Sequence, residues 1–193
     1  SIEKANSDNN LNYSVKVSSD IYDVKKSDKI VLPGQGSFKA CKAGIDNIKG
    51  MQAELNESVL IKKKPIYGIC AGMQLFATRG HEERITEGLN WIPGEVNKLE
   101  VDASKLKIPH MGWNELKIKN SSKVFQDINK NDHAYFIHSY EFIPEDKTVI
   151  SLTSNYGKEV MAAVSLENIF GSQFHPEKSQ ITGIKILTNF LNL

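Results

Sequence analysis

The segment 65–76 reads PIYGICAGMQLF and decides the fold. Its first part, Pro65–Ile69, is a short apolar run typical of a buried strand, and Ala71–Thr78 has the pattern of a helix. A buried strand that turns directly into a helix is the unit from which parallel sheets are built, because parallel neighbours need a long crossover. The segment therefore predicts an α/β protein.

Short β-branched runs alternate with helical stretches along the rest of the chain, which favours a largely parallel central sheet flanked by helices. We expect further strands at Lys29–Leu32, Ala134–His138, Val160–Val164 and Asn168–Phe174, and weaker ones at Tyr13–Ser18 and Lys147–Leu152. We expect two other helices, at Phe38–Lys62 and Ile181–Leu191, although Gly44 and Gly50 weaken the first. The alternation between Glu95 and Lys119 predicts a short antiparallel insertion.

The N-terminal residues Ser1–Asn6 read as the end of a helix with no strand before it. Doubly wound sheets usually open with a buried strand and a functional turn, so we expect the first strand of the fold to be missing from this chain. With 193 residues and no repeat or linker, residues 1–193 are expected to form a single domain.

The composition argues against several classes of function. There are 24 Lys and Arg against 23 Asp and Glu, a net charge of +1, so no global field attracts nucleic acid or an anionic membrane. Only Arg79 and Arg84 carry a guanidinium, too few for a surface that reads bases or phosphates. No apolar run reaches the ~18–20 residues of a membrane span. Two cysteines cannot build a disulfide framework and favour a reducing, cytoplasmic setting.

Cys70 lies where the predicted strand turns into the helix, within Gly68-Ile69-Cys70-Ala71-Gly72. This spacing is that of a nucleophile elbow with Cys as the nucleophile. Glycine is needed on both sides because side chains there would collide across a sharp turn. The helix N-terminus favours a thiolate over a thiol and offers N–H groups to an oxyanion. The alternative is that Cys70 is a small buried side chain beside a tight turn.

A thiolate nucleophile needs a base, and the base needs a group that orients it. His175-Pro176-Glu177 follows the predicted strand Asn168–Phe174, at the strand end where sites in parallel sheets collect. Pro176 fixes the backbone between His175 and Glu177, so both side chains can point into one crevice. The tripeptide alone favours a surface turn, but together with Cys70 it predicts a Cys-His-Glu triad.

The segment Pro33–Phe38, PGQGSF, leaves the first predicted strand. Gly34 and Gly36 flank Gln35 and would allow a peptide N–H to turn into the crevice, as an oxyanion donor must. A phosphate-binding loop or a simple turn are the alternatives, but the Gly-Lys-Ser/Thr of a nucleotide P-loop is absent. We expect Gly34, Gln35, Gly36 and Ala71 to form an oxyanion site.

Together these three motifs resemble those of the class I, or triad, glutamine amidotransferases. Two further segments, Pro109–Asn114 (PHMGWN) and Tyr135–Tyr140 (YFIHSY), resemble the glutaminase subunit of imidazole glycerol phosphate synthase, from histidine biosynthesis. The first of these segments is the most specific element, and the resemblance runs from Lys29 to the C-terminus. The chain departs from the family pattern in the missing first strand and in the residue types at Gln35 and Ala71. Those two substitutions leave the backbone N–H in place.

The resemblance implies hydrolysis of glutamine to glutamate and ammonia by Cys70, His175 and Glu177, without a cofactor or metal. It adds four contacts to bound glutamine: Gly36, Gln74, Ser139 and Tyr140. The ammonia would pass to a cyclase subunit, in a heterodimer, that makes imidazole glycerol phosphate and aminoimidazole carboxamide ribotide. The residues expected to face that subunit are Pro109, His110, Met111, Gly112, Trp113 and Asn114. The isolated chain is expected to be a poor glutaminase until that partner docks.

Three rival functions remain open from the residues. The chain could be a triad glutaminase for guanylate, anthranilate or pyridoxal phosphate synthesis, although Pro109–Asn114 argues against this. It could be a non-catalytic regulatory or scaffold subunit, which the set Cys70, His175 and Glu177 disfavours. A redox-sensing protein with one reactive cysteine would not need His175-Pro176-Glu177 at a strand end.

The remaining Cys and His residues have structural interpretations. Cys41 lies in a predicted helix without an adjacent base, and His81 lies in a charged loop where we expect it to be solvated. His133 and His138 are five positions apart, which puts them on opposite faces of a strand and argues against a metal site.

Overall fold

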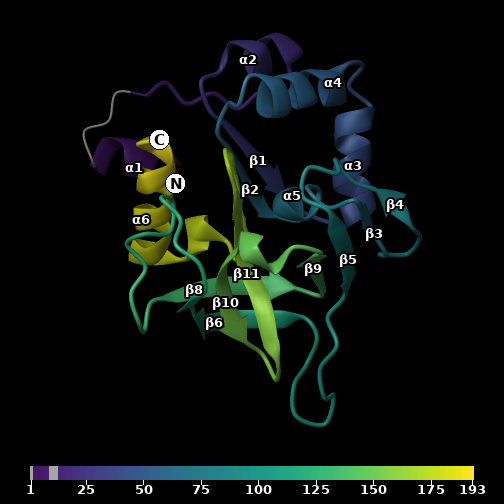
Figure 1. Ribbon diagram of the computed structural model, residues 1–193, viewed down its shortest axis with the longest axis vertical. Coiled ribbons are helices and arrows are strands. Elements are labelled where there is room, and N and C mark those ends of the chain that lie inside the picture. Colours follow the sequence, from purple (N-terminus) through teal and green to yellow (C-terminus); the bar gives the residue numbers. More distant parts are fainter. Residues whose placement is uncertain (1, 9–12) are drawn as a thin grey trace.

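The computed structural model describes residues 2–8 and 13–193. Figure 1 shows α1 and α6 to the left of the strands, and α2 and α4 above them. The helices are α1 (Ile2–Asp8), α2 (Ile21–Lys26), α3 (Phe38–Asp46), α4 (Met51–Asn56), π-helical η1 (Glu57–Ile61), α5 (Ala71–Gln74), 3₁₀-helical η2 (Lys147–Val149) and η3 (Pro176–Lys178), and α6 (Gln180–Leu191). The strands are β1 (Ile30–Gly34), β2 (Ile66–Cys70), β3 (Arg79–Gly80), β4 (Thr86–Glu87), β5 (Gly94–Lys98), β6 (His110–Glu115), β7 (Lys117–Ile118), β8 (His133–His138), β9 (Tyr140–Pro144), β10 (Ile150–Asn155), β11 (Glu159–Leu166) and β12 (Ile169–Ser172). No helix in the described ranges is long and apolar enough to cross a membrane.

The main sheet has six strands in the order β1-β2-β12-β11-β10-β7. β1, β2 and β12 run parallel, whereas β11, β10 and β7 pair antiparallel, so the expectation of a largely parallel sheet is wrong and the sheet is mixed. The reason is the length of the connections: only Glu167 and Asn168 separate β11 from β12, and a two-residue loop can join only antiparallel neighbours.

Two smaller sheets complete the β structure of the described residues. β5 pairs antiparallel with β9 in the sheet β4-β3-β5-β9, and β6 pairs antiparallel with β8. Antiparallel pairing in the Glu95–Lys119 region is therefore confirmed. Its strands do not pair with one another: β5, β6 and β7 pair antiparallel with β9, β8 and β10, which come later in the chain, and β5 also pairs in parallel with the earlier strand β3.

Five predicted strands are confirmed within a few residues, as β1, β2, β8, β11 and β12. The strand expected at Tyr13–Ser18 is wrong: the segment has no regular structure, and Val17 is 99% exposed because its alternating side chains find no sheet to pack on. The strand expected at Lys147–Leu152 begins later, because a turn of 3₁₀ helix capped by Asp146 occupies Lys147–Val149.

The helix expected at Phe38–Lys62 is instead three pieces, α3, α4 and η1. The break falls at Gly50, which adopts φ 86°, a left-handed conformation that glycine accepts without penalty. The helix expected at Ala71–Thr78 is only α5, Ala71–Gln74, because the next N–H groups, of Phe76 and Ala77, bond three residues back in tighter turns. The helix expected at Ile181–Leu191 is confirmed as α6, and Ile2–Asp8 is helical, as expected for the N-terminal residues.

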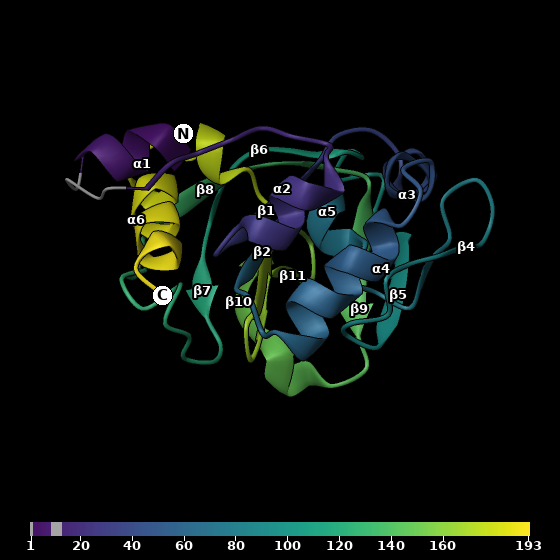
Figure 2. The ribbon, with the colours of Figure 1, turned by 90° about the horizontal axis from the view of Figure 1, so that it is seen from above.

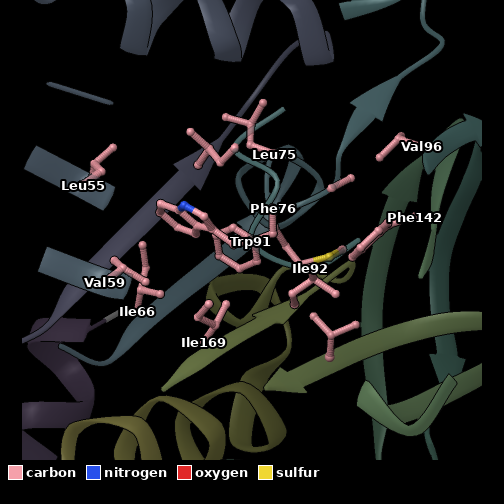
Figure 3. Close-up of a cluster of buried hydrophobic side chains, with 14 of the residues drawn as sticks. Leu55, Val59, Ile66, Leu75, Phe76, Trp91, Ile92, Val96, Phe142 and Ile169 are labelled. Atoms are coloured by element: carbon pink, nitrogen blue, oxygen red, sulfur yellow. The ribbon is translucent and has the colours of Figure 1, made fainter. Parts of the chain in front are cut away.

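Strand β2 is buried on both faces, which explains its uninterrupted apolar sequence. On one face Ile66 packs in a cluster with Leu55 and Val59 of the α4–η1 layer, and Figure 3 shows these side chains converging with Phe76 and Trp91. In Figure 2, which shows the molecule from above, α4 lies on one side of the sheet. Helices α6 and α1 lie together at the left end of the molecule.

On the opposite face of β2, Tyr67 packs against Phe190 of α6, with ring centroids 5.5 Å apart. Helix α1 in turn covers α6, through Ala5, Leu187 and Leu191. The sheet is thus held between two helical layers, and the carboxyl ends of β1, β2 and β12 open at one common edge.

Candidate active site

Three predicted motifs meet at the carboxyl edge of the parallel strands. Gly34 at the end of β1 lies opposite Cys70 at the end of β2, and Ile69 lies opposite Ser172 at the end of β12. His175 follows Ser172 by three residues. Segments that are distant in sequence therefore reach one place because parallel strands end together.

Cys70 occupies a strained turn between β2 and α5. Its backbone has φ 54° and ψ −116°, a conformation rare for any residue other than glycine. A Cβ on Gly68 would lie 2.6 Å from Cα of Met73, and a Cβ on Gly72 would lie 2.0 Å from the carbonyl oxygen of Leu32. The expected need for glycine is confirmed, but the clashes are with the following turn and with β1, not across the elbow.

The predicted oxyanion residues lie beside the elbow. A Cβ on Gly34 would lie 2.0 Å from the nitrogen of Gly72, so the end of β1 touches the first turn of α5. Ala71 opens α5, where backbone N–H groups have no partner within the helix. Gly36 has φ 97°, and the exposed residue Gln35 accepts a hydrogen bond from the Cys41 thiol on its carbonyl oxygen. The structure thus brings Gly34, Gln35, Gly36 and Ala71 together.

His175 and Glu177 form the closest side-chain contact of the site. Nδ1 of His175 lies 2.6 Å from Oε1 of Glu177. The interaction with the Cys70 sulfur, followed by the hydrogen bond to Glu177, raises the pKa of His175 to about 9. Burial of Glu177 opposes its ionisation, but the hydrogen bond from His175 keeps the pKa of the carboxyl below its usual range. The structure therefore brings the sulfur of Cys70, the imidazole of His175 and the carboxyl of Glu177 together.

The backbone around His175 is also fixed. Its N–H donates to the carbonyl oxygen of Tyr135 on β8 at 2.9 Å, and Ser179 Oγ donates to its carbonyl oxygen at 2.6 Å. Pro176 begins η3, where its missing N–H costs nothing. The imidazole is consequently held on a rigid support rather than on a mobile loop.

The expected glutamine contacts lie around this centre with different exposure. Gln74 is buried in α5, and its Nε2 donates to the carbonyl oxygen of Tyr140 at 3.0 Å and to Oε1 of Gln173 at 2.9 Å. Ser139 and Tyr140 are half-buried where β8 turns into β9, and Gly36 is exposed at the mouth of the β1 loop. The structure therefore places the polar groups of Gln74 and Tyr140 in one network.

Gln173 was not predicted as a site residue. It is fully buried, and its Nε2 lies 3.6 Å from the sulfur of Cys70. A signal was available in the sequence, because Gln173 lies near the end of the predicted strand Asn168–Phe174, and a buried amide must find polar partners.

The segment Pro109–Asn114 has two distinct faces on β6. Met111 and Trp113 point outward and are 56% and 49% exposed, whereas His110 is buried and Gly112 faces open space. His110 Nδ1 lies 3.0 Å from Nε2 of His138, a pairing that the sequence did not reveal. The exposed apolar side chains are consistent with an interface, and the buried imidazole points back toward the site.

The other predictions for Cys and His residues have mixed outcomes. His133 is exposed and His138 buried, which confirms that they lie on opposite faces of β8, and the described residues contain no group of three or more metal-ligating side chains. His81 is half-buried with Nε2 3.1 Å from Glu95, so the expectation that it is simply solvated is wrong. Cys41 lies in α3, as expected, and burial raises the pKa of its thiol.

Comparison with known protein sequences finds a family and relatives that agree with one another. The family described as glutamine amidotransferase class-I matches residues 5–193. The chain is 52% identical over 179 residues to "Imidazole glycerol phosphate synthase subunit HisH" of Pelagibacter ubique (strain HTCC1062), covering 93% of this chain and 86% of the relative. It is 41% identical over 192 residues to the protein of the same description in Brucella suis biovar 1 (strain 1330), covering 98% and 89%.

Solved structures of glutamine amidotransferases share the fold at low sequence identity. One described as a glutamine amidotransferase superposes with a TM-score of 0.71 at 15% identity, covering 100% of this chain and 93% of that one. Another, from Thermotoga maritima, superposes with a TM-score of 0.65 at 16% identity, covering 99% and 89%.

Proposed function

The chain belongs to the class I glutamine amidotransferases and, within them, to the family of the HisH glutaminase subunit of imidazole glycerol phosphate synthase in histidine biosynthesis, and from this we propose the residues that carry the reaction. Cys70 is the nucleophile, His175 the base and Glu177 the group that orients it. The observation that carries this assignment is the contact of His175 with Glu177 at 2.6 Å beside a cysteine held in a strained elbow. One glutamine amidotransferase domain over residues 1–193 is part of the proposal, supported by the family match to 5–193.

The first step is attack of the Cys70 thiolate on the side-chain carboxamide of glutamine. The carbonyl oxygen gains negative charge, and it needs donors that are already in place. The N–H of Ala71 is at the start of α5, and the Gly34–Gly36 loop begins where the end of β1 touches the first turn of that helix. They form the proposed oxyanion site.

His175 then acts twice. It gives its proton to the departing ammonia, and afterwards it takes a proton from the water that attacks the γ-glutamyl thioester. A pKa raised to about 9 keeps the imidazole protonated before ammonia leaves. Glu177 on Nδ1 leaves Nε2 to face the sulfur, so one ring nitrogen performs both transfers.

The proposed contacts to bound glutamine are Gly36, Gln74, Ser139 and Tyr140. Gln74 Nε2 already donates to Tyr140 and Gln173, so Gln74 is left with Oε1 as an acceptor, which suits the α-ammonium group of an amino acid. Glutamine selectivity therefore depends on a polar network that is complete before substrate binds.

The proposed partner is a cyclase subunit that takes up ammonia to make imidazole glycerol phosphate and aminoimidazole carboxamide ribotide, in a heterodimer with this chain. Support comes from the face of β6, where Met111 and Trp113 expose large apolar side chains. The proposed interface is Pro109, His110, Met111, Gly112, Trp113 and Asn114. Because the nucleophile must stay a free thiol, we place the complex in the reducing cytoplasm.

The decisive experiment mixes this chain with a cyclase subunit and follows glutamate release from glutamine. We expect release that depends on Cys70, and trapping of a γ-glutamyl thioester on its sulfur. Glutamate release without a trapped thioester would contradict the role of Cys70. No release with a competent cyclase and its substrate would revive the interpretation as a non-catalytic subunit.

A further inference from the structure

A continuous chain of buried and half-buried hydrogen bonds joins strand β6 to the sulfur of Cys70. We propose that the side-chain amide of Gln173 is a hydrogen-bond donor to the Cys70 thiolate, which makes Gln173 a further catalytic residue. The carbonyl oxygen of Tyr140 sets the direction of this amide, and the histidine pair that reaches to β6 holds that oxygen in place. The inference rests on the proposed function, in which Cys70 is the nucleophile.

Gln173 is placed at the sulfur by its backbone and its amide. It is fully buried between β12 and His175, and its N–H donates to the carbonyl oxygen of Ala162 at 2.8 Å. Nε2 lies 3.6 Å from the sulfur of Cys70, within reach of a hydrogen bond to sulfur, and Oε1 lies 2.9 Å from Nε2 of Gln74. The amide therefore bridges Gln74 and the proposed nucleophile.

The direction of that bridge is set by the carbonyl oxygen of Tyr140. A carbonyl oxygen can only accept, so the atom of Gln74 that lies 3.0 Å from it must be the NH₂ group. The same nitrogen faces Gln173, whose facing atom must then be the oxygen. Gln173 consequently presents its own NH₂ group, a donor, to Cys70.

The carbonyl oxygen of Tyr140 also fixes which nitrogens of His138 and His110 carry a proton. Nδ1 of His138 lies 2.9 Å from the same carbonyl oxygen and must carry a proton to donate to it. In a neutral imidazole the other nitrogen is then an acceptor. Nε2 of His138 lies 3.0 Å from Nδ1 of His110, so His110 Nδ1 is the donor.

At the β6 end of this chain of hydrogen bonds, Asn114 independently assigns the proton of His110 to Nδ1. Asn114 Nδ2 donates to the carbonyl oxygen of Asn155 at 2.9 Å, and Asn114 Oδ1 accepts from the N–H of Glu115 at 2.9 Å. Nδ2 is also 3.1 Å from Nε2 of His110. His110 Nε2 is therefore an acceptor, which again leaves the proton on Nδ1.

The surroundings keep the two imidazoles neutral and in place. Burial lowers the pKa of His110 and of His138 to about 4 each, so one proton per ring is the state near neutral pH. The His110 ring is stacked between Phe136 and Tyr156, with centroids 4.5 Å and 4.0 Å away. Each link is thus fixed in orientation as well as in protonation.

A donor on the sulfur has a chemical use that His175 alone does not supply. When the thioester is hydrolysed, His175 is occupied with the attacking water while the sulfur leaves as a thiolate. The NH₂ group of Gln173 can hold that developing charge throughout, and hydrogen bonds to charged groups are the strong ones. The titratable groups that act on this sulfur are His175, with Glu177 behind it, and Cys41 of α3.

The first test measures the rate at which iodoacetamide alkylates Cys70 as a function of pH. It compares the unaltered protein with the variants Gln173→Leu and Gln173→Glu. Loss of a hydrogen bond to a charged group should slow alkylation near neutral pH by roughly tenfold or more, and move the midpoint to higher pH. Gln173→Glu keeps the shape of the side chain but places acceptor oxygens at the sulfur, so it should slow alkylation further. Cys41 in the same sample is the internal control and should react at an unchanged rate. A Cys70 profile unchanged in both variants would overturn the proposal.

The second test needs no substitution at Gln173. Nitrogen chemical shifts of the histidine side chains in the unaltered protein should show His110 and His138 protonated on Nδ1 and bare on Nε2. Asn114→Asp removes the first donor of the chain and should change both ring signals and slow Cys70 alkylation, while Asn192→Asp, an exposed control, should do neither. Protonation of either ring on Nε2 would break the link from β6 to the carbonyl oxygen of Tyr140 and refute the part of the proposal that assigns the histidine pair this supporting role.

Neither measurement requires glutamine turnover. Absence of glutaminase activity with a competent cyclase and its substrate, together with these shifts, would refute the proposed function and retain the hydrogen bond from Gln173 to Cys70. Normal glutamine turnover with a Cys70 alkylation profile that is unchanged in the Gln173 variants would retain the proposed function and refute the inference.

Discussion

Nδ1 of His175 lies 2.6 Å from Oε1 of Glu177, and this contact decides which ring nitrogen faces Cys70. A carboxylate on Nδ1 holds the imidazole in the form whose Nε2 exchanges protons with the sulfur and the leaving group. The contact also contributes to raising the pKa of His175 to about 9, after the interaction with Cys70 itself.

Replacing Glu177 by Gln should therefore weaken activity without abolishing it. Loss of the carboxylate removes an orienting contact and should lower kcat/KM by about 10²–10⁴, less than loss of the nucleophile. The pKa of His175 should fall from about 9, so the alkaline limb of the glutaminase pH profile should move to lower pH. If Glu177→Gln were as inactive as Cys70→Ala, Glu177 would need a role beyond orientation.

Replacing Cys70 by Ala or Ser should separate the two nitrogen sources of the complex. Glutamine-dependent product formation should fall by more than about 10⁵-fold, because a covalent intermediate can no longer form. Synthesis from added ammonium should persist, since Cys70 releases ammonia and does not use it. His175→Ala should behave like Cys70→Ala because the two residues act as a unit. Equal loss with both nitrogen sources would contradict this division.

A glutamine-like diazo-ketone should label Cys70 and spare Cys41. Cys70 lies at the start of α5 beside the imidazole of His175, whereas burial raises the pKa of Cys41 and makes its thiolate scarce. Peptide mapping by mass spectrometry would locate the label. Labelling of Cys41 first would be incompatible with the assignment.

Acid should destabilise the fold through the histidine pair. The pKa of His110 and of His138 is lowered from 6.5 to about 4. Between pH 6.5 and about pH 4, the unfolded chain therefore binds protons at these histidines and the folded chain does not. The free energy of unfolding should fall as pH drops from about 6.5 towards 4, by on the order of 2 kcal/mol per ring. His110→Gln should be less stable at neutral pH but lose less on acidification. Urea unfolding at about pH 7 and about pH 4.5 measures both slopes, and parallel losses would exclude the histidines as the cause.

Docking of the cyclase should switch on the glutaminase. A glycine-flanked peptide at Gln35 can rest with its N–H turned away from the site, and a missing oxyanion donor costs about 10²–10³ in rate. Glutamate release should thus be slow for the chain alone and fastest with the partner and its substrate. Equal rates in all three conditions would eliminate the switch. Trp113→Ala, at a side chain that is 49% exposed, should weaken this coupling more than it lowers the free energy of unfolding.

The parts of the site that could be predicted from sequence were those that follow from local rules. The elbow, the glycine loop and His175-Pro176-Glu177 each sit at a strand end, and the parallel strands β1, β2 and β12 bring them together. The sequence signals that Gln173 needs a polar partner, but it does not identify that partner. The contact of Gln173 with Cys70 and the His110–His138 pair were missed because the partners lie on other strands, which no local pattern reports. The sheet was expected to be mostly parallel because the two-residue link at Glu167–Asn168 was not recognised as a hairpin.

The backbone of Cys70 has a consequence for how such a chain can evolve. Its φ of 54° and ψ of −116° cost on the order of 1–3 kcal/mol, and glycine at this position would relieve that cost. A lineage that kept the protein only as a scaffold would drift toward the relaxed residue and gain stability by doing so. If Cys70 has the proposed role, cysteine at position 70 is the less stable choice of residue, and selection for activity has to maintain it.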